Sequence, residues 1–80
     1  MMIYIIAVNK LRAQRAAEFF ELKPTQWRFV DSPMILIGLH PDFREHRALS
    51  VGSWDERKDA QQLKDMLHAA GWHPVQLNGV

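Results

Sequence analysis

The strongest constraint on the fold of this chain is an almost unbroken apolar segment, Ile3 to Val8, that ends at Asn9. Short apolar runs of this kind are typical of strands buried on both faces, as in a parallel sheet with helices on its two sides. The segment is much shorter than the roughly 20 residues of a membrane-spanning helix, and no basic segment precedes it as in a signal peptide. We therefore expect Ile3 to Val8 to be the central strand of a folded domain.

Two amphipathic segments predict helices that pack against such a sheet. The first runs from Leu11 to Leu22 and is stopped by Pro24, and the second ends at Gly71. Their apolar sides consist of Ala13, Ala16, Ala17 and Phe20 in the first helix, and of Ala60, Leu63, Leu67 and Ala70 in the second. Two capping boxes, Ser53 to Glu56 and Asp59 to Gln62, leave the start of the second helix open.

Three further strands are predicted at Gln26 to Val30, Arg47 to Val51 and His73 to Leu77. The first of these alternates aromatic with polar residues, which suits a strand near the edge of the sheet. Pro74 confines the last strand to an edge position or to its own first residue. The polar stretch from His40 to His46 is predicted to form a surface loop.

The segment from Pro33 to Leu39 fits two interpretations. Its β-branched residues favour a strand, whereas Ser32, Pro33 and Gly38 match the N-cap, the first position and the C-terminal left-handed position of a short helix. We choose the short helix, because a parallel neighbour for the next strand requires a crossover and no other segment is available to make it.

The predicted order is therefore βαβαβαβ, which indicates a single α/β domain over residues 1–80 with a mostly parallel four-stranded sheet. Right-handed crossovers and the strongly buried first strand favour the spatial order 2-1-3-4, as in a truncated flavodoxin-like, Rossmann-like fold. Ligands of such sheets bind beyond the carboxyl ends of the strands, where neighbouring connections leave in opposite directions. In this order that point lies between the first and third strands.

Composition limits the functions that this domain can have. The chain has no cysteine, which excludes disulfides, thiolate zinc sites and thiol nucleophiles and makes a reducing cytoplasm the expected compartment. Its formal net charge of +1 is far from the strongly basic balance of non-specific nucleic-acid binders. The charge is uneven, because residues 1–30 carry five cations and two anions, a local excess of three. We therefore expect an anionic ligand or partner rather than nucleic acid or a membrane.

The candidate ligand-binding or partner-binding residues follow the first and third strands. They are Asn9, Lys10, Arg12, Arg15, Gly52, Ser53, Trp54 and Arg57. Three cations near the start of a helix, where the backbone N–H groups already carry partial positive charge, suit a phosphate, a carboxylate or an acidic partner. The alternative is that these side chains are simply solvated, and the loop that precedes the helix has no glycine with which to wrap a pyrophosphate.

Trp54 is the second candidate feature of this site. An indole at the end of a strand can present a flat face to a nucleobase or anchor a protein partner, or it can cover the end of the sheet. We expect Arg57 either to stack on Trp54 or to pair with Asp55. The aromatic residues Trp27 and Phe29 are assigned instead to the core or to a dimer patch. Formation of a homodimer is therefore one of the alternatives that the sequence allows.

No catalytic residue, metal site or cofactor is predicted. The four histidines lack the helical or short-loop spacing of metal ligands. Ser53 has no nucleophile elbow around it and no histidine with a predictable position beside it. The carboxylates of the second helix alternate with cations, as on a solvated helix face.

Several short motifs resemble a known group of proteins. They are Trp27-Arg28-Phe29-Val30, Asp31-Ser32-Pro33, Gly38-Leu39, Val51-Gly52-Ser53-Trp54, Glu56-Arg57 and Asp59. Together they resemble the small Rossmann-like proteins of unassigned function encoded by actinobacterial bacteriophages. Ser53 stands where these proteins have threonine, and the loop from Pro41 to His46 is additional. The resemblance implies a fold and a phage source, and it supplies no catalytic residue.

Two function classes remain open from the sequence. The first is a non-catalytic binding module, phage-encoded and directed at a host protein in the host cytoplasm. This class suits the small size, the uncommitted aromatic residues and the lack of catalytic motifs. The second is a binder or processor of a nucleotide-like or phosphorylated ligand at the point between the first and third strands.

Overall fold

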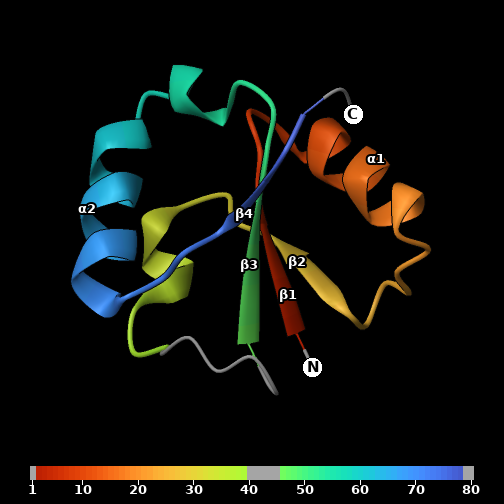
Figure 1. The fold of residues 1–80 in the computed structure, drawn as a ribbon, viewed down its shortest axis with the longest axis horizontal. Helices are drawn as coiled ribbons and strands as arrows, with labels where there is room; N and C mark the ends of the chain where they lie inside the picture. The colour runs from red at the N-terminus through yellow and green to blue at the C-terminus, as the bar shows by residue number, and fades with distance from the viewer. Residues whose placement is uncertain (1, 40–45, 79–80) are drawn as a thin grey trace.

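The computed structural model describes residues 2–39 and 46–78, which form one parallel sheet with helices on both faces (Figure 1). The strands are β1 (Met2–Ile6), β2 (Trp27–Phe29), β3 (His46–Val51) and β4 (Val75–Leu77). They lie in the order β2-β1-β3-β4, and every neighbouring pair is parallel. The predicted α/β fold and strand order are therefore confirmed, and the architecture is that of a small Rossmann-like domain.

Helices cover the two faces of the sheet unequally. Helix α1 (Lys10–Phe19) lies on one face, and helix α2 (Ala60–Ala70) lies on the other together with the short 3-10 helix η1 (Pro33–Leu36) (Figure 1). The side chains of β1 contribute to the hydrophobic clusters on both faces of the sheet. Tyr4 and Ile6 join the hydrophobic cluster under α2, whereas Ile5 and Ala7 join the cluster under α1. This alternation explains why the first apolar run is unbroken, since each of its two faces is buried.

Helix α1 packs on the sheet through alanines and ends earlier than predicted. Ala13, Ala16 and Ala17 are buried, but Phe20 is 46% exposed and lies at the C-cap, so its expected place in the core is wrong. The reason is the backbone of Glu21, which has a φ of 55° and lets the Leu22 N–H bond the Ala17 carbonyl at 2.9 Å. This left-handed turn ends the helix before the apolar pattern does.

The segment between β2 and β3 begins with the predicted short helix, in 3-10 form. The Ser32 hydroxyl accepts a hydrogen bond from the Met34 N–H at 3.2 Å, and Gly38 adopts a φ of 78°. Both capping positions are therefore as expected. The predicted loop at 40–45 lies outside the described residues, and His46 belongs to β3.

The connection from β3 to α2 resolves the open start of the second helix. A 3-10 turn, η2 (Trp54–Glu56), comes first, and α2 begins at Ala60. Neither capping box forms, because the side chains of Ser53 and Asp59 make no capping hydrogen bond. Within α2, the predicted stripe is buried at Ala60, Leu63 and Leu67, while Ala70 is only half-buried.

In the part of the chain that the structure describes, no helix has the length and apolar character needed to cross a bilayer.

Candidate functional site

The carboxyl ends of β1 and β2 are held together by the side chain of Arg57, which comes from the connection between β3 and α2. Its Nη1 donates hydrogen bonds to the carbonyl oxygens of Ala7, at 3.2 Å, and of Val30. Its Nη2 donates to the carbonyl oxygen of Asp31 at 3.0 Å. One guanidinium therefore joins three segments of the chain at the edge where parallel α/β sheets bind ligands.

The remaining donors of Arg57 bind the carboxylate of Asp59. Nε lies 2.8 Å from Oδ1, and Nη2 lies 2.7 Å from Oδ2. The five guanidinium N–H groups are thus all occupied by acceptors of the protein itself, and the side chain of Arg57 is only 8% exposed. The expectation that Arg57 stacks on Trp54 or pairs with Asp55 is wrong. The guanidinium lies over the ring of Phe29, 5.6 Å from its centroid, and its ion pair is with Asp59. We call this set of contacts the Arg57 network.

A hollow of about 500 Å³ lies beside the Arg57 network, and we call it the carboxyl-end hollow. It is lined by Val8, Asn9, Lys10, Phe29, Asp31, Arg57, Lys58 and Asp59. Three of the predicted site residues, Asn9, Lys10 and Arg57, therefore meet in one place. The charges of its lining are mixed, however, because Asp59 is paired with Arg57 and Asp31 offsets one of the two lysines.

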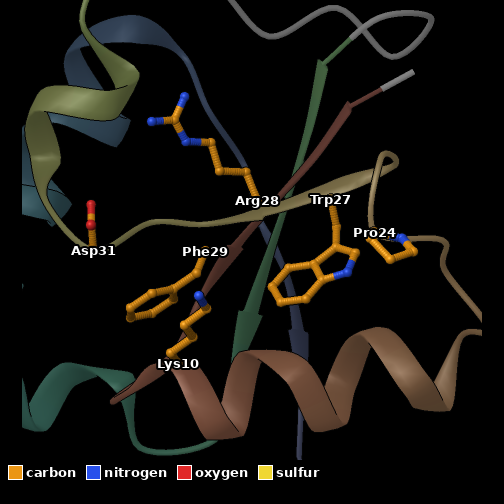
Figure 2. Close-up of a pocket in the computed structure, with 6 residues that line it drawn as sticks. All are labelled: Lys10, Pro24, Trp27, Arg28, Phe29 and Asp31. Atoms are coloured by element: carbon orange, nitrogen blue, oxygen red, sulfur yellow. The ribbon is translucent and has the colours of Figure 1, made fainter.

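A second hollow, of about 400 Å³, lies between the edge strand β2 and helix α1, and we call it the edge hollow (Figure 2). Its lining residues are Lys10, Pro24, Trp27, Arg28, Phe29 and Asp31. Trp27 and Phe29 point toward α1, where Lys10 lies, and Arg28 points away on the opposite side of the strand (Figure 2). Both aromatic side chains are half-buried, so each packs on the core under α1 and also shows part of its ring to solvent.

At the start of α1, one of the backbone N–H groups that could bind an anion is already bonded within the protein. The Asn9 side chain accepts a hydrogen bond from the Arg12 N–H at 2.9 Å and so caps the helix. Lys10, Arg12 and Arg15 are all exposed, but of the three only Lys10 lines the two hollows. Arg12 and Arg15 therefore lie outside both hollows.

Apart from Arg57, the predicted residues after β3 lie outside the two hollows that Asn9 and Lys10 line. Gly52 has a φ of 53° and donates its N–H to the Leu77 carbonyl at 2.8 Å. Trp54 is half-buried against the cluster under α2, and the Nζ of Lys64 lies 5.9 Å from its ring centroid. Neither the carboxyl-end hollow nor the edge hollow includes Gly52, Ser53 or Trp54.

The sequence did not single out the residues that line the edge hollow, apart from Lys10. From the sequence, Trp27 and Phe29 are expected in the core or in a dimer patch, and Arg28 is expected only as part of the motif Trp27-Arg28-Phe29-Val30. The signal that identifies them is the alternation of aromatic and charged residues in a short edge strand. In such a strand the aromatic side chains point to one face of the sheet and the charged side chains to the other, and the backbone N–H and C=O groups on the outer side have no strand to pair with.

Among the described residues, no group of three or more histidine and carboxylate side chains is arranged to hold a metal ion. Comparisons of the chain with protein-family models, with curated proteins and with solved structures found no significant match.

Proposed function

We propose that this protein is a non-catalytic binding module that recognises another protein through the surface formed by β2 and the start of α1. The observation that carries the proposal is the edge hollow. It places two half-exposed aromatic rings, Trp27 and Phe29, beside Lys10 on the α1 side of β2, and Arg28 lies on the other side of the same strand. Tryptophan, other aromatic residues and arginine are the side chains enriched at protein interfaces and at their binding hot spots.

The two cations of this surface, Lys10 and Arg28, outnumber the one carboxylate among its lining residues, Asp31, and so favour an acidic partner. Neither Lys10 nor Arg28 forms an ion pair with any described residue, so both cations are available to a bound carboxylate. The resemblance to actinobacterial phage proteins suggests the source of the partner. On that ground, we propose that the protein is phage-encoded and acts on a host protein in the host cytoplasm.

Lys10→Glu tests this surface with little risk to the fold. An acidic residue in the first turn of a helix interacts favourably with the helix dipole, so α1 should be at least as stable as before. We expect the immobilised variant to retain about tenfold less partner from an actinobacterial lysate, which corresponds to about 1.4 kcal/mol. Bound protein is quantified by mass spectrometry against the parent domain.

The matched control is Lys64→Glu, which makes the same change of charge on α2, on the opposite face of the sheet. It should leave capture unchanged. Equal loss in the two variants would show that net charge rather than this surface determines binding. Unchanged capture with Lys10→Glu would contradict the proposed surface.

The second candidate function is the binding of a phosphorylated ligand, which is favoured by the presence of Lys10 and Lys58 on the carboxyl-end hollow. The carboxylate of Asp31 opposes it, and every donor of Arg57 is already occupied. We therefore expect nucleotides and sugar phosphates to leave the melting temperature unchanged, whereas a bound ligand raises it by mass action. A rise in melting temperature that is lost in Lys58→Glu would contradict the binding module and would favour a binder of phosphorylated ligands at the carboxyl-end hollow.

A further inference from the structure

The outer side of β2 offers backbone hydrogen-bonding groups to a partner. On the inner side, Gln26 accepts from the Ile3 N–H and the Val30 N–H donates to Ile5, both at 2.9 Å. Because the bonding direction alternates along a strand, the N–H and C=O of Trp27 and the N–H of Phe29 point away from β1. The strand order places β2 at the end of the sheet, so no described strand pairs with these groups.

The open edge is short and has a defined end. The carbonyl of Phe29 accepts a hydrogen bond from the Asp31 N–H at 3.1 Å, which turns the chain away directly after the strand. The groups that remain open are therefore those of Trp27 and the N–H of Phe29. Three bonds of this kind suit the pairing of one short extended segment rather than a long strand.

The side chains around this edge define what such a segment must carry. In a sheet, side chains that lie laterally adjacent on one face are in contact, and opposite charges placed there attract. A segment added beside β2 would set alternate side chains next to Trp27 and Phe29 on the α1 side. The side chain between them would lie next to Arg28 on the other side, where no described residue pairs with that guanidinium.

We propose that the partner of β2 is an extended segment with the pattern apolar, acidic, apolar, which adds a strand to the edge of the sheet. This inference rests on the proposed binding function and specifies its ligand. The apolar side chains enter the edge hollow against Trp27 and Phe29, and the acidic side chain pairs with Arg28. Backbone bonds supply the attachment, and the alternating side chains supply the selectivity.

The other open edge, at β4, lacks this combination of features. Val75 is 69% exposed, but the side chain of Gln76 is tied to the Gly52 carbonyl at 3.0 Å and to Asn78 at 3.1 Å. Pro74, directly before the strand, has no N–H to donate. The β4 edge therefore serves as an internal control for any test of strand addition at β2.

The probe is the peptide Ser-Thr-Val-Glu-Val-Thr-Ser with blocked ends, titrated into the 15N-labelled protein. We expect amide exchange at Trp27 and Phe29 to slow as the peptide saturates, while exchange at Gln76 stays unchanged. Two control peptides replace the central glutamate with lysine, or the second valine with proline, which cannot donate. Both should bind at least about fivefold more weakly, as expected for a lost cross-strand pair or backbone bond.

A charge exchange separates pairing at Arg28 from a general effect of charge. Arg28→Glu should weaken binding of the glutamate peptide about fivefold and strengthen binding of the lysine peptide by a similar factor. Arg15→Glu is the matched control, because Arg15 is exposed on α1 and lines neither hollow. It should change neither affinity.

The results distinguish this inference from the proposed function. No slowing of exchange at Trp27 and Phe29, or no reversal of preference in Arg28→Glu, would overturn strand addition. If Lys10→Glu still reduced partner capture in that case, the binding module would stand with a different mode of recognition. If Lys10→Glu left capture unchanged, the proposed function itself would fail.

Discussion

Replacing Arg57 with methionine should lower the free energy of unfolding by about 3 kcal/mol, because removing one partner of a buried charge pair leaves the other without compensation. In this protein the loss would leave Asp59 and the carbonyls of Ala7, Val30 and Asp31 without the donor that they share. For a domain of this size, we expect the melting temperature to fall by about 15 °C. Thermal and urea unfolding monitored by circular dichroism measure both quantities.

Two further variants identify the cause of this loss. Arg57→Lys keeps the positive charge but has only three donors on one nitrogen, so it cannot bond three carbonyls and both carboxylate oxygens together. It should recover less than half of the lost stability. Arg15→Met removes an exposed arginine and should change stability by no more than about 0.5 kcal/mol. An Arg57→Met variant as stable as the parent would show that the network does not hold the strand ends together.

The fold could be predicted from the sequence because the relevant signals are local and periodic. The unbroken run from Ile3 to Val8 indicates a strand buried on both faces, and such a strand must lie inside the sheet. The short helix from Pro33 was identified by its caps, Ser32 and Gly38, although its composition favours a strand. Once three crossovers were assigned, few strand orders remained.

The end of α1 could not be predicted in the same way. Apolar spacing extends to Phe20 and Leu22, but the helix ends where Glu21 takes a left-handed conformation. Glutamate gives no sign of such a turn, whereas glycine at the end of α2 does. The pattern therefore located the apolar side of α1 correctly at its alanines and placed the boundary too late.

The candidate site was predicted less well than the fold, for a reason that lies in the topology. The two connections that leave β1 and β3 go to opposite faces of the sheet, so Asn9 starts a helix on one face while Trp54 packs toward α2 on the other. Proximity of the strand ends therefore did not bring the side chains together. Of the residues that the sequence predicted at the carboxyl ends of the strands, only Asn9, Lys10 and Arg57 line one hollow in the structure.

Arg57 illustrates the part of the site that no sequence pattern reveals. Its acceptors Ala7 and Val30 lie 50 and 27 residues away along the chain. They are backbone carbonyls, which every residue possesses, so nothing in the composition marks them as partners. The pairing with Asp59, two residues away, is the one local contact. A sequence reader could suspect that pair but could not separate it from the equally close Asp55.

The second large effect is expected from Leu67→Ala, which should lower the free energy of unfolding by about 3 kcal/mol. Leu67 is 5% exposed and belongs to the core cluster under α2 that contains Tyr4, Ile6 and Leu63. Its replacement removes buried methyl groups and leaves a cavity that the sheet and helix fill only in part. The free energy of unfolding of a small domain is about 5 kcal/mol, so a loss of this size should leave a large fraction of the variant unfolded on warming.

The control for Leu67→Ala is Leu11→Ala, which makes the same chemical change on α1. Leu11 is 57% exposed, so its truncation removes little buried surface and should cost less than about 0.5 kcal/mol. Urea unfolding of both variants gives the comparison directly. If the two variants unfolded at the same urea concentration, α2 would not rest on the sheet through Leu67, and the assignment of the cluster beneath it would be wrong. If only Leu67→Ala is destabilised, the apolar residues that predict α2 from the sequence are also the residues that stabilise its packing on the sheet.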